Sequence, residues 1–202
     1  VVDNVVRNGA VADAASADAA VRGVRRLNLL MASEPRPGDP ARFVIDPDLA
    51  DVGVGCMLQD TAGRLWYGTA TQGIRLRDGT QRVRFGADDG LPDSAVHCLL
   101  EDRRQCIWAG TRGGLARYDG HCAHTVDARA GLDHSSVVAL LEDPGGAVWA
   151  GTRSGVTRFG SNGVSAVLER SGRAVTVLLT DRQGTLWCGQ CPGGMRRCGA
   201  GV

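Results

Sequence analysis

QDTAGRLWYGT (residues 59–69) returns three times along the chain, as EDRRQCIWAGT (101–111), EDPGGAVWAGT (142–152) and TDRQGTLWCGQ (180–190). The tryptophans of these phrases stand 42, 41 and 38 residues apart; they are Trp66, Trp108, Trp149 and Trp187. A repeat of about 40 residues with one aromatic anchor is typical of a propeller blade or a comparable stacked unit. We therefore expect one continuous core built from about four copies of a single unit.

Each copy has the pattern of four short antiparallel strands. The apolar runs 96–102, 137–143 and 175–181 fit an inner strand that is buried on both faces. A tight turn led by an aspartate follows, and its closing glycine supplies a positive φ, at a position that Gln105 holds in the second copy. In the next strand the tryptophan alternates with a glycine such as Gly110, which leaves room for a neighbouring sheet. Two further strands joined by DG or NG turns complete the blade, so the predicted fold is an all-β propeller of about four four-stranded blades.

The two ends of the repeat are incomplete in opposite ways. Residues 42–45 match an outer strand that has no blade of its own, and the last copy has three strands, at about 175 to 198, without a fourth. An N-terminal strand that completes the last blade would close the ring and remove exposed sheet edges. The alternative is a truncated part of a larger propeller, and the sequence leaves both open.

Residues 1–38 do not follow the repeat, so we divide the chain into an N-terminal extension, 1–38, and the propeller repeats, 39–202. The extension is alanine-rich with helix-compatible spacing and ends at PRPGDP, which predicts a short helix and a linker. Because the chain opens with valine rather than methionine, it fits a processed product or a piece of a larger polypeptide, with any signal or anchor outside it.

The composition argues against several classes of partner. With 23 basic and 22 acidic residues, the chain gives no electrostatic reason to expect a nucleic acid or an anionic membrane. No stretch approaches the roughly 20 apolar residues that a membrane helix needs. A balanced surface of this kind more often binds neutral or protein ligands.

The seven cysteines carry little functional signal. Cys56 and Cys98 occupy one repeat position, where the other copies have alanine and valine, so this position accepts a small buried side chain. Cys188, Cys191 and Cys198 lie together in the last copy, and Cys188 with Cys191 forms a CxxC motif that could bind zinc or pair as a disulfide. An odd total leaves at least one thiol free.

Side chains that suit ligand binding gather in two kinds of loop. The loops after the tryptophan strands and the connectors to the next blade share one rim, because successive loops of an up-and-down sheet alternate ends. Arginines and carboxylates on such a rim suit hydroxyl-rich or carboxylated small molecules. We expect the ligand-binding residues to be Arg112, Arg153, Asp93, Asp133 and His134. The alternative is that each is an ordinary solvated loop residue.

No catalytic constellation stands out. The glycine-rich strings GTRGG and GTRSG lack the lysine and the strand-to-helix context of a phosphate loop. The four histidines, His97, His121, His124 and His134, fall in different repeat positions and show no metal spacing; His97 is most simply a strand residue. We therefore expect a non-enzymatic protein with no cofactor and no metal, although the fold alone does not exclude a site grafted onto the rim.

The pattern DxxGxLWxGTxxGLxRYDG, followed by the DGLP connector at 89–92, resembles the two-component regulator propeller repeat. The matching positions lie in three copies: Asp60, Gly63, Leu65, Trp66, Gly68 and Thr69; Ile107, Trp108, Gly110, Thr111, Gly114, Leu115, Arg117, Tyr118, Asp119 and Gly120; and Trp149 to Thr152. In that family such repeats build extracytoplasmic sensor propellers, usually larger than four blades, joined to a membrane helix and then to a histidine kinase or another output domain. This chain departs from the family in having fewer repeats and neither of those segments.

The resemblance implies a non-enzymatic ligand-sensing or signal-input module of a two-component type regulator, in an extracytoplasmic (periplasmic) location. Its partner would be a small, carbohydrate-like molecule or a protein, with no nucleic acid, and a membrane-anchored signalling domain would lie outside this chain. One alternative is a propeller that serves as a scaffold for protein–protein interactions. Another is a propeller lyase or hydrolase.

Overall fold

The computed structural model describes residues 49–126, 131–132, 134–160, 163–170 and 172–198. Within these ranges the protein is all-β, with one short 3-10 helix, η1 (Ala87–Asp89), in a connector. The strands are β1 (Val54–Gln59), β2 (Leu65–Thr69), β3 (Ile74–Asp78), β4 (Gln81–Phe85), β5 (Val96–Glu101), β6 (Ile107–Thr111), β7 (Leu115–Tyr118), β8 (Ala123–Val126), β9 (Val137–Glu142), β10 (Val148–Thr152), β11 (Gly155–Gly160), β12 (Gly163–Arg170), β13 (Ala174–Thr180), β14 (Leu186–Cys191) and β15 (Gly194–Cys198).

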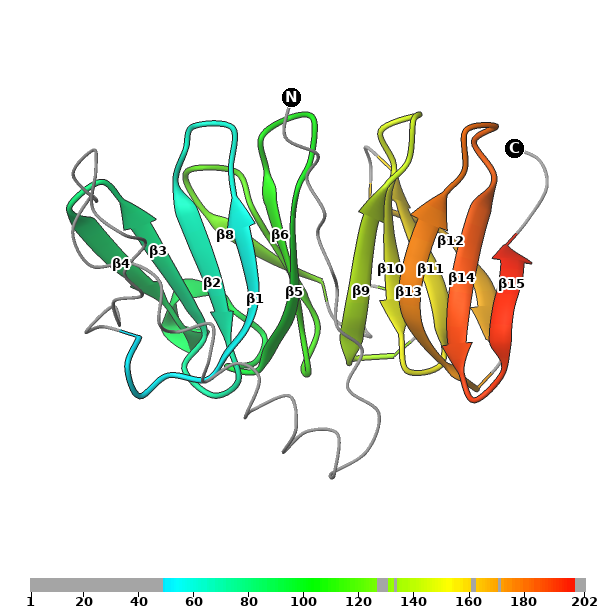
Figure 1. Cartoon of the computed structure of the whole chain (residues 1–202), viewed down its shortest axis with the longest axis horizontal. Coiled ribbons are helices and arrows are strands. Elements are labelled where there is room, and N and C mark those ends of the chain that lie inside the picture. Colours follow the sequence, from blue (N-terminus) through cyan, green and yellow to red (C-terminus); the bar gives the residue numbers. More distant parts are fainter. Residues whose placement is uncertain (1–48, 127–130, 133, 161–162, 171, 199–202) are drawn as a thin grey trace, which may run out of the picture.

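The described strands form four antiparallel sheets, each a simple meander in sequence order. Three sheets have four strands, β1 to β4, β5 to β8 and β9 to β12, and the last has three, β13 to β15. The inner strands β1, β5, β9 and β13 pack against one another in turn, and the sheets stand side by side like the blades of a fan (Figure 1). We call the sheets blades 1 to 4. The predicted propeller architecture is confirmed, including the three strands of the last copy.

Adjacent blades meet where the tryptophan strand leaves a gap. A Cβ atom added to Gly110 would lie 2.4 Å from Cys98 Sγ and 2.7 Å from Val137 Cγ1 of the next blade, closer than real Cβ contacts. Gly68 has the same relation to Cys56 and Val96. The glycine therefore lets the next inner strand approach, as the alternation of ring and glycine predicts. The expected small buried side chain is confirmed at Cys98, whereas Cys56 is only partly buried.

The aspartate of each turn fixes the tryptophan that follows it by six residues. In blade 2 the Oδ1 atom of Asp102 accepts the backbone N–H groups of Arg104 and Cys106 at 2.9 Å, while Oδ2 accepts the indole N–H of Trp108 at 2.8 Å. The same indole bond recurs at 2.8 to 2.9 Å in the other blades, from Trp66 to Asp60, Trp149 to Asp143 and Trp187 to Asp181. The sequence predicted that these aspartates cap the backbone of the turn. In the structure each aspartate also accepts the indole hydrogen bond of its tryptophan.

The turn that precedes each tryptophan strand requires a left-handed residue. Its last position has φ of 82°, 81° and 80° at Gly63, Gly146 and Gly184, and Gln105 adopts φ of 62° in blade 2. Among the described residues Gln105 is the non-glycine residue with positive φ. The loss of the glycine thus leaves the turn type unchanged and places the strain on Gln105.

The outward face of blade 4 carries apolar side chains without a neighbouring blade. Val177, Leu179 and Met195 are 45%, 58% and 70% exposed. The nearest atoms to a Cβ added at Gly189 belong to Val177 of the same blade, at 3.4 Å, whereas in blades 1 to 3 they include the next blade. Blades 1 and 4 lie at opposite ends of the fan (Figure 1). The described residues therefore form an open arc.

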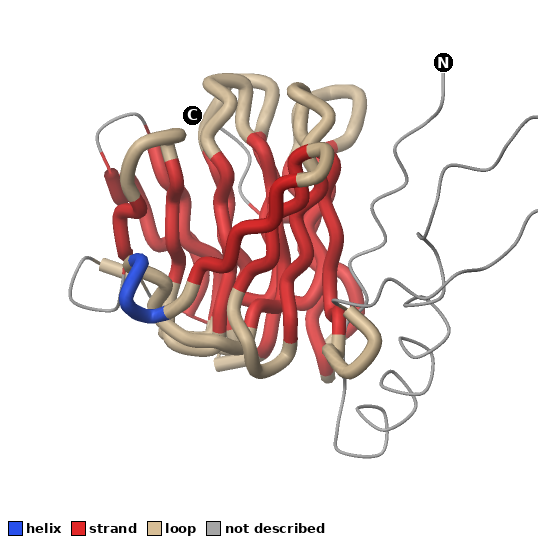
Figure 2. The backbone as a smooth tube through the Cα atoms, turned by 90° about the vertical axis from the view of Figure 1, so that its left-hand side faces the viewer, coloured by secondary structure: helices blue, strands red, loops and turns tan. Residues whose placement is uncertain are grey.

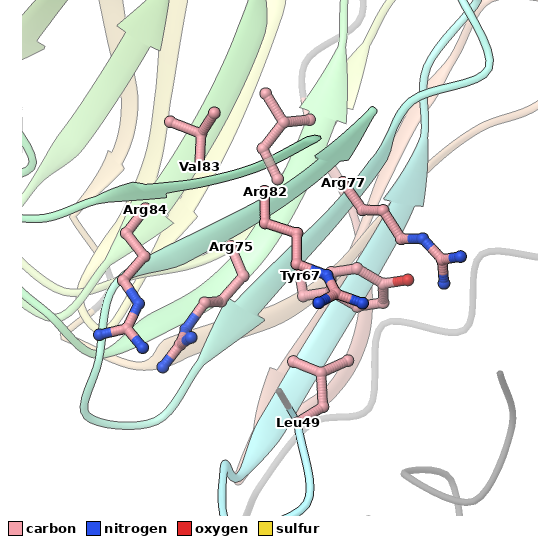
Figure 3. A pocket seen from close by; sticks show the side chains of 8 residues that line it. Leu49, Tyr67, Arg75, Arg77, Arg82, Val83 and Arg84 are labelled. Carbon is pink, nitrogen blue, oxygen red and sulfur yellow. The ribbon is translucent and has the colours of Figure 1, made fainter. Parts of the chain in front are cut away.

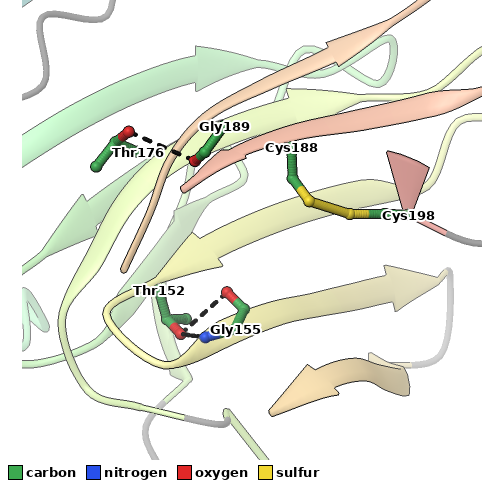
Figure 4. Close-up of a disulfide and its surroundings, with 6 residues drawn as sticks. All are labelled: Thr152, Gly155, Thr176, Cys188, Gly189 and Cys198. Atoms are coloured by element: carbon green, nitrogen blue, oxygen red, sulfur yellow. Dashed lines mark hydrogen bonds between the residues drawn. A yellow bond between two sulfur atoms is a disulfide. The ribbon is translucent and has the colours of Figure 1, made fainter. Parts of the chain in front are cut away.

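A disulfide joins Cys188 on β14 to Cys198 on β15 (Figure 4). Cys191, the other member of the CxxC motif, is free and exposed. Of the two readings that the sequence left open, the disulfide is present, but with Cys198 as the partner of Cys188.

Some of the sequence-based expectations fall outside the described residues. The helix in the extension 1–38, the boundary at residue 39 and the closing strand at 42–45 all do, so they stay predictions. In Figure 2 the strands run between two ends at which the loops gather.

Candidate functional site

The predicted rim forms because each loop after a tryptophan strand bonds to the connector that precedes its blade. One backbone hydrogen bond recurs in the first three blades: Ala70 N to Gly53 O at 2.9 Å, Arg112 N to Ala95 O at 3.0 Å and Arg153 N to Ser136 O at 3.2 Å. We call the surface made by these loops and connectors the connector rim. It lies at the end of the blades opposite the turns that carry the four aspartates, and Figure 2 shows η1 at this end.

A buried threonine fixes the start of the loop in blades 1 to 3. Thr152 Oγ1 donates to Gly155 O at 3.2 Å and accepts the N–H of Gly155 at 3.0 Å (Figure 4). Thr111 makes the same pair of bonds with Gly114. Because this side chain locks the turn, the next residue, an arginine in blades 2 and 3, projects from a fixed backbone.

In blade 2 the structure joins two of the predicted site residues. Arg112 Nε lies 3.1 Å from Asp93 Oδ2, and the two side chains are 71% and 18% exposed. Asp93 Oδ1 accepts the backbone N–H of Ala95 at 2.8 Å. That backbone bond, together with the bond and charge of Arg112, lowers the pKa of Asp93. The carboxylate is therefore ionised at neutral pH and holds the arginine over the rim.

In blade 3 Ser136 connects two other predicted residues. Arg153 Nε donates to Ser136 Oγ at 3.3 Å, and the backbone N–H of Ser136 donates to His134 Nδ1 at 3.0 Å. A neutral His134 then carries its proton on Nε2. Asp133, the fifth predicted residue, lies outside the described residues.

His97 links the two groups, a role that the sequence analysis missed. This half-buried side chain of β5 places Nδ1 3.0 Å from the carbonyl oxygen of Val137 on β9. Burial lowers the pKa of His97; the bond to Val137 opposes this, and the charges of Arg153 and Arg112 lower the pKa further while that of Asp93 raises it. Val137 directly follows Ser136, which bonds to Arg153, and His97 lies two residues after Ala95, whose carbonyl oxygen accepts the backbone N–H of Arg112. These hydrogen bonds connect the rim groups of blades 2 and 3 through His97.

A surface rich in arginine lies on the outward face of blade 1. A shallow pocket of about 130 Å³ is lined by Leu49, Tyr67, Arg75, Leu76, Arg77, Arg82, Val83 and Arg84. Arg75 faces Arg84 and Arg77 faces Arg82 across β3 and β4. Figure 3 shows the guanidinium group of Arg82 beside the Tyr67 ring and those of Arg75 and Arg84 near each other, away from the ring. The positions of Arg75 and Arg77 hold Ala116 and Tyr118 in blade 2 and Thr157 and Phe159 in blade 3, whereas blade 4 has Arg196 at the position of Arg75. None of these arginines was among the predicted site residues.

Within the described ranges, one group of side chains has the composition of a metal site: Asp119, Cys122 and His124. It lies in the hairpin between β7 and β8, at the rim opposite the connectors. No helix in the described part of the chain is long and apolar enough to cross a membrane.

Residues 90–113 match the family model described as two component regulator propeller. This segment contains Asp93, His97 and Arg112, so the blade 2 half of the rim cluster lies within the matched repeat. No curated protein matches the chain.

Several solved structures share the fold. The extracellular domain of BT3049, described as a hybrid two component system of B. thetaiotaomicron, aligns with a TM-score of 0.62 and 20% identity over 72% of this chain and 21% of that chain. The extracellular domain of BT4673 from the same organism aligns with a TM-score of 0.62 and 22% identity over 82% of this chain and 22% of that chain. Virginiamycin B lyase from Staphylococcus aureus aligns with a TM-score of 0.56 and 14% identity over 70% of this chain and 53% of that chain.

The chain spans about a fifth of the length of the two extracellular domains. At these identities the likeness is one of fold. The family match agrees with the resemblance noted in the sequence: residues 90–113 match a two-component regulator propeller repeat, in a fold shared with extracellular domains of hybrid two-component systems.

Proposed function

We propose that this chain is part of the ligand-sensing, signal-input propeller of a two-component type regulator and that it binds a small molecule on the connector rim without transforming it. The observation that carries the proposal is the cluster of Asp93, Arg112, His97 and Arg153, which spans two blades. Such an arrangement lets one ligand contact both blades.

The chemistry of the cluster favours a hydroxyl-rich ligand with a carboxylate. Arg112 and Arg153 offer guanidinium donors that match a carboxylate, while Asp93 and a neutral His97 accept hydrogen bonds from hydroxyl groups. Sugar acids combine both features. Asp133 and His134 complete the proposed site on the blade 3 side.

The proposed location is extracytoplasmic. Two solved neighbours are extracellular domains, and the disulfide between Cys188 and Cys198 suits an oxidising compartment. Lyases share the fold as well, but among the described rim residues the hydroxyl group of Ser136 bonds to Arg153, and His134 accepts the backbone N–H of Ser136 rather than its hydroxyl. This arrangement supports binding rather than nucleophilic catalysis.

A thermal-shift measurement tests the proposal. A ligand present at about 100 times its dissociation constant stabilises the folded state by about 2.7 kcal/mol, which raises the Tm of a chain of this size by about 5 to 10 °C. The panel compares glucuronate and galacturonate with glucose, galactose and short oligosaccharides of both. We expect a uronate to raise the Tm of the wild type more than its neutral counterpart does.

The variants Arg112→Ala and Arg153→Ala should lose this shift, while Arg104→Ala, an exposed arginine at the opposite rim, should keep it. A uronate shift that persists in both rim variants would place the site elsewhere, with the arginine pocket of blade 1 the first surface to examine. If no compound of the panel raises the Tm, the proposal of a hydroxyl-rich, carboxylated ligand is contradicted.

A second candidate function is a scaffold for protein–protein interactions, favoured by the exposed apolar face of blade 4. Val177, Leu179 and Met195 lie together on that face, and contiguous exposed apolar surface often marks an interface. A stable protein partner whose binding is lost in Leu179→Glu and kept in Arg112→Ala would favour the scaffold over the sensor.

A further inference from the structure

The hairpin between β7 and β8 brings together three side chains that bind transition metals. Asp119 directly follows β7, Cys122 directly precedes β8, and His124 lies on β8. All three are exposed, and one donor atom from each lies within 4.8 Å of the others. Their sequence spacing had given no metal signal, because the site depends on strand pairing rather than on helical periodicity.

The distances between the donor atoms fit a tetrahedral site. Cys122 Sγ lies 3.1 Å from His124 Nε2 and 3.7 Å from Asp119 Oδ2, and His124 Nε2 lies 3.3 Å from Asp119 Oδ2. Zinc bonds of about 2.0 to 2.3 Å at tetrahedral angles place the donor atoms about 3.3 to 3.6 Å apart. A cation can therefore enter with shifts of a few tenths of an ångström.

The backbone of the hairpin orients the carboxylate before any cation arrives. Asp119 Oδ1 accepts the backbone N–H groups of His121 and Cys122, each at 3.0 Å. Gly120, with φ of 96°, permits the tight turn that aims both amides at this oxygen. Oδ2 is left to face His124 and Cys122.

The equivalent hairpin of blade 1 keeps the aspartate but lacks the cysteine and the histidine. Asp78, the last residue of β3, corresponds to Asp119, which directly follows β7. Thr80, Gln81 and Val83 occupy the positions of His121, Cys122 and His124. A hairpin of this kind thus needs no thiol or imidazole to form.

We propose that Asp119, Cys122 and His124 form a binding site for one zinc-class divalent cation, with the fourth position open to water. One thiolate, one imidazole and one carboxylate suit zinc and its neighbours, whereas magnesium and calcium prefer oxygen ligands. On binding, the Cys122 thiol loses its proton to the buffer as the S–metal bond forms. The zinc site lies at the rim opposite the connector rim and does not depend on ligand binding there.

Titration calorimetry with ZnCl₂ tests the site, on chelator-treated protein that keeps its disulfide between Cys188 and Cys198. We expect one zinc per chain and no comparable binding of Mg²⁺ or Ca²⁺. Cys122→Ser and His124→Gln should each weaken zinc binding by at least about 100-fold, since even partners outside the ligand shell cost about 10- to 100-fold. Co²⁺ should give a thiolate charge-transfer band that Cys122→Ser removes.

Two matched variants serve as controls. Cys191→Ser removes the other exposed free thiol, and Asp78→Asn changes the corresponding aspartate of blade 1; both should bind zinc as the wild type does. Nitrogen-15 NMR of the histidines gives a readout that does not depend on affinity, because zinc should move the ring resonances of His124 and leave those of His97 and His134 in place.

Zinc binding that survives both Cys122→Ser and His124→Gln, or that falls equally in Cys191→Ser, would overturn the assignment. A stoichiometry other than one, or calcium binding as tight as zinc binding, would overturn it as well.

Discussion

The fit between neighbouring blades makes the effect of one methyl group depend on where it is added. At Gly110 an added Cβ meets Cys98 Sγ at 2.4 Å and two carbons of Val137 at 2.7 and 3.2 Å, and both neighbours are fully buried. Val137 belongs to the inner strand of blade 3, so blades 2 and 3 must move apart to remove the steric clash with the added Cβ. Overpacking of this kind costs about 1 to 3 kcal/mol, and the lower unfolded-state entropy of alanine offsets about 0.5 to 1 kcal/mol of it.

Gly189 holds the equivalent position in blade 4, where the nearest atom to an added Cβ is Val177 Cβ at an ordinary 3.4 Å. Gly189→Ala should therefore leave stability unchanged or raise it by up to about 1 kcal/mol. Gly151 should be intermediate, because Val175 O and Cγ1 would lie at 2.9 and 3.1 Å. The expected order of destabilisation is Gly110→Ala, then Gly151→Ala, then Gly189→Ala.

Urea unfolding measures the three differences as shifts in midpoint at constant slope. For a chain of this size, 1 kcal/mol corresponds to about 2 to 4 °C in Tm, so thermal melting gives an independent check. Gly189→Ala as damaging as Gly110→Ala would refute the reasoning, since it would mean that another blade covers blade 4 in solution.

Three further effects follow from the structure. Asp102→Ala removes three hydrogen bonds to a buried carboxylate and should lower the free energy of unfolding in urea by about 2 to 4 kcal/mol. Asp181→Ala, in the more exposed turn of blade 4, should lower it less, and equal losses of stability would contradict this account. Loss of the disulfide in a Cys188→Ala, Cys198→Ala double variant should lower stability by about 2 to 3 kcal/mol, given a separation of 10 residues, and an unchanged urea midpoint would show that the bond is not formed. Burial lowers the pKa of His97 in the folded protein, so as the pH falls the unfolded chain takes up a proton on this ring before the folded protein does. The free energy of unfolding should therefore decrease as the pH drops below about 6.5. His97→Gln should flatten this part of the stability curve, and an unchanged slope would contradict the burial of the ring.

Much of the fold could be predicted from the chain because each blade repeats the same local rules. The inner strand expected at 96–102 is observed as Val96–Glu101, and the three-stranded last copy is observed at 174–198. Even Gln105, which breaks the glycine pattern, adopts the positive φ that the turn requires. Within the described residues, periodicity and turn chemistry therefore predict the strands of all four blades.

The bond from each aspartate to its tryptophan could also have been found. The separation of six residues is the same in all four copies, from Asp60 and Trp66 to Asp181 and Trp187. Strand alternation could likewise have excluded the CxxC pair, because Cys188 and Cys191 are three residues apart on β14 and point to opposite faces of the sheet. Cys198 pairs with Leu186, two residues from Cys188, and shares its face.

The candidate site was only partly predictable because it depends on contacts between blades. The pair of Arg112 and Asp93 follows from loops that share one blade. His97 reaches the carbonyl oxygen of Val137 across a blade interface, at a distance that repeat alignment does not give. The hairpin group of Asp119, Cys122 and His124 depends on which residues face each other across β7 and β8.

The four histidines offer the most direct test of the central claim, that the connector rim is the ligand-binding face. His97 and His134 lie at this rim, and His121 and His124 lie in the opposite hairpin. Nitrogen-15 NMR of the histidine rings during titration with the uronate that gives the largest thermal shift reports both ends of the blades in one experiment. We expect the resonances of His97 and His134 to move with saturation while those of His121 and His124 stay fixed. Movement of the hairpin histidines alone, or of none of the four at saturation, would contradict the account.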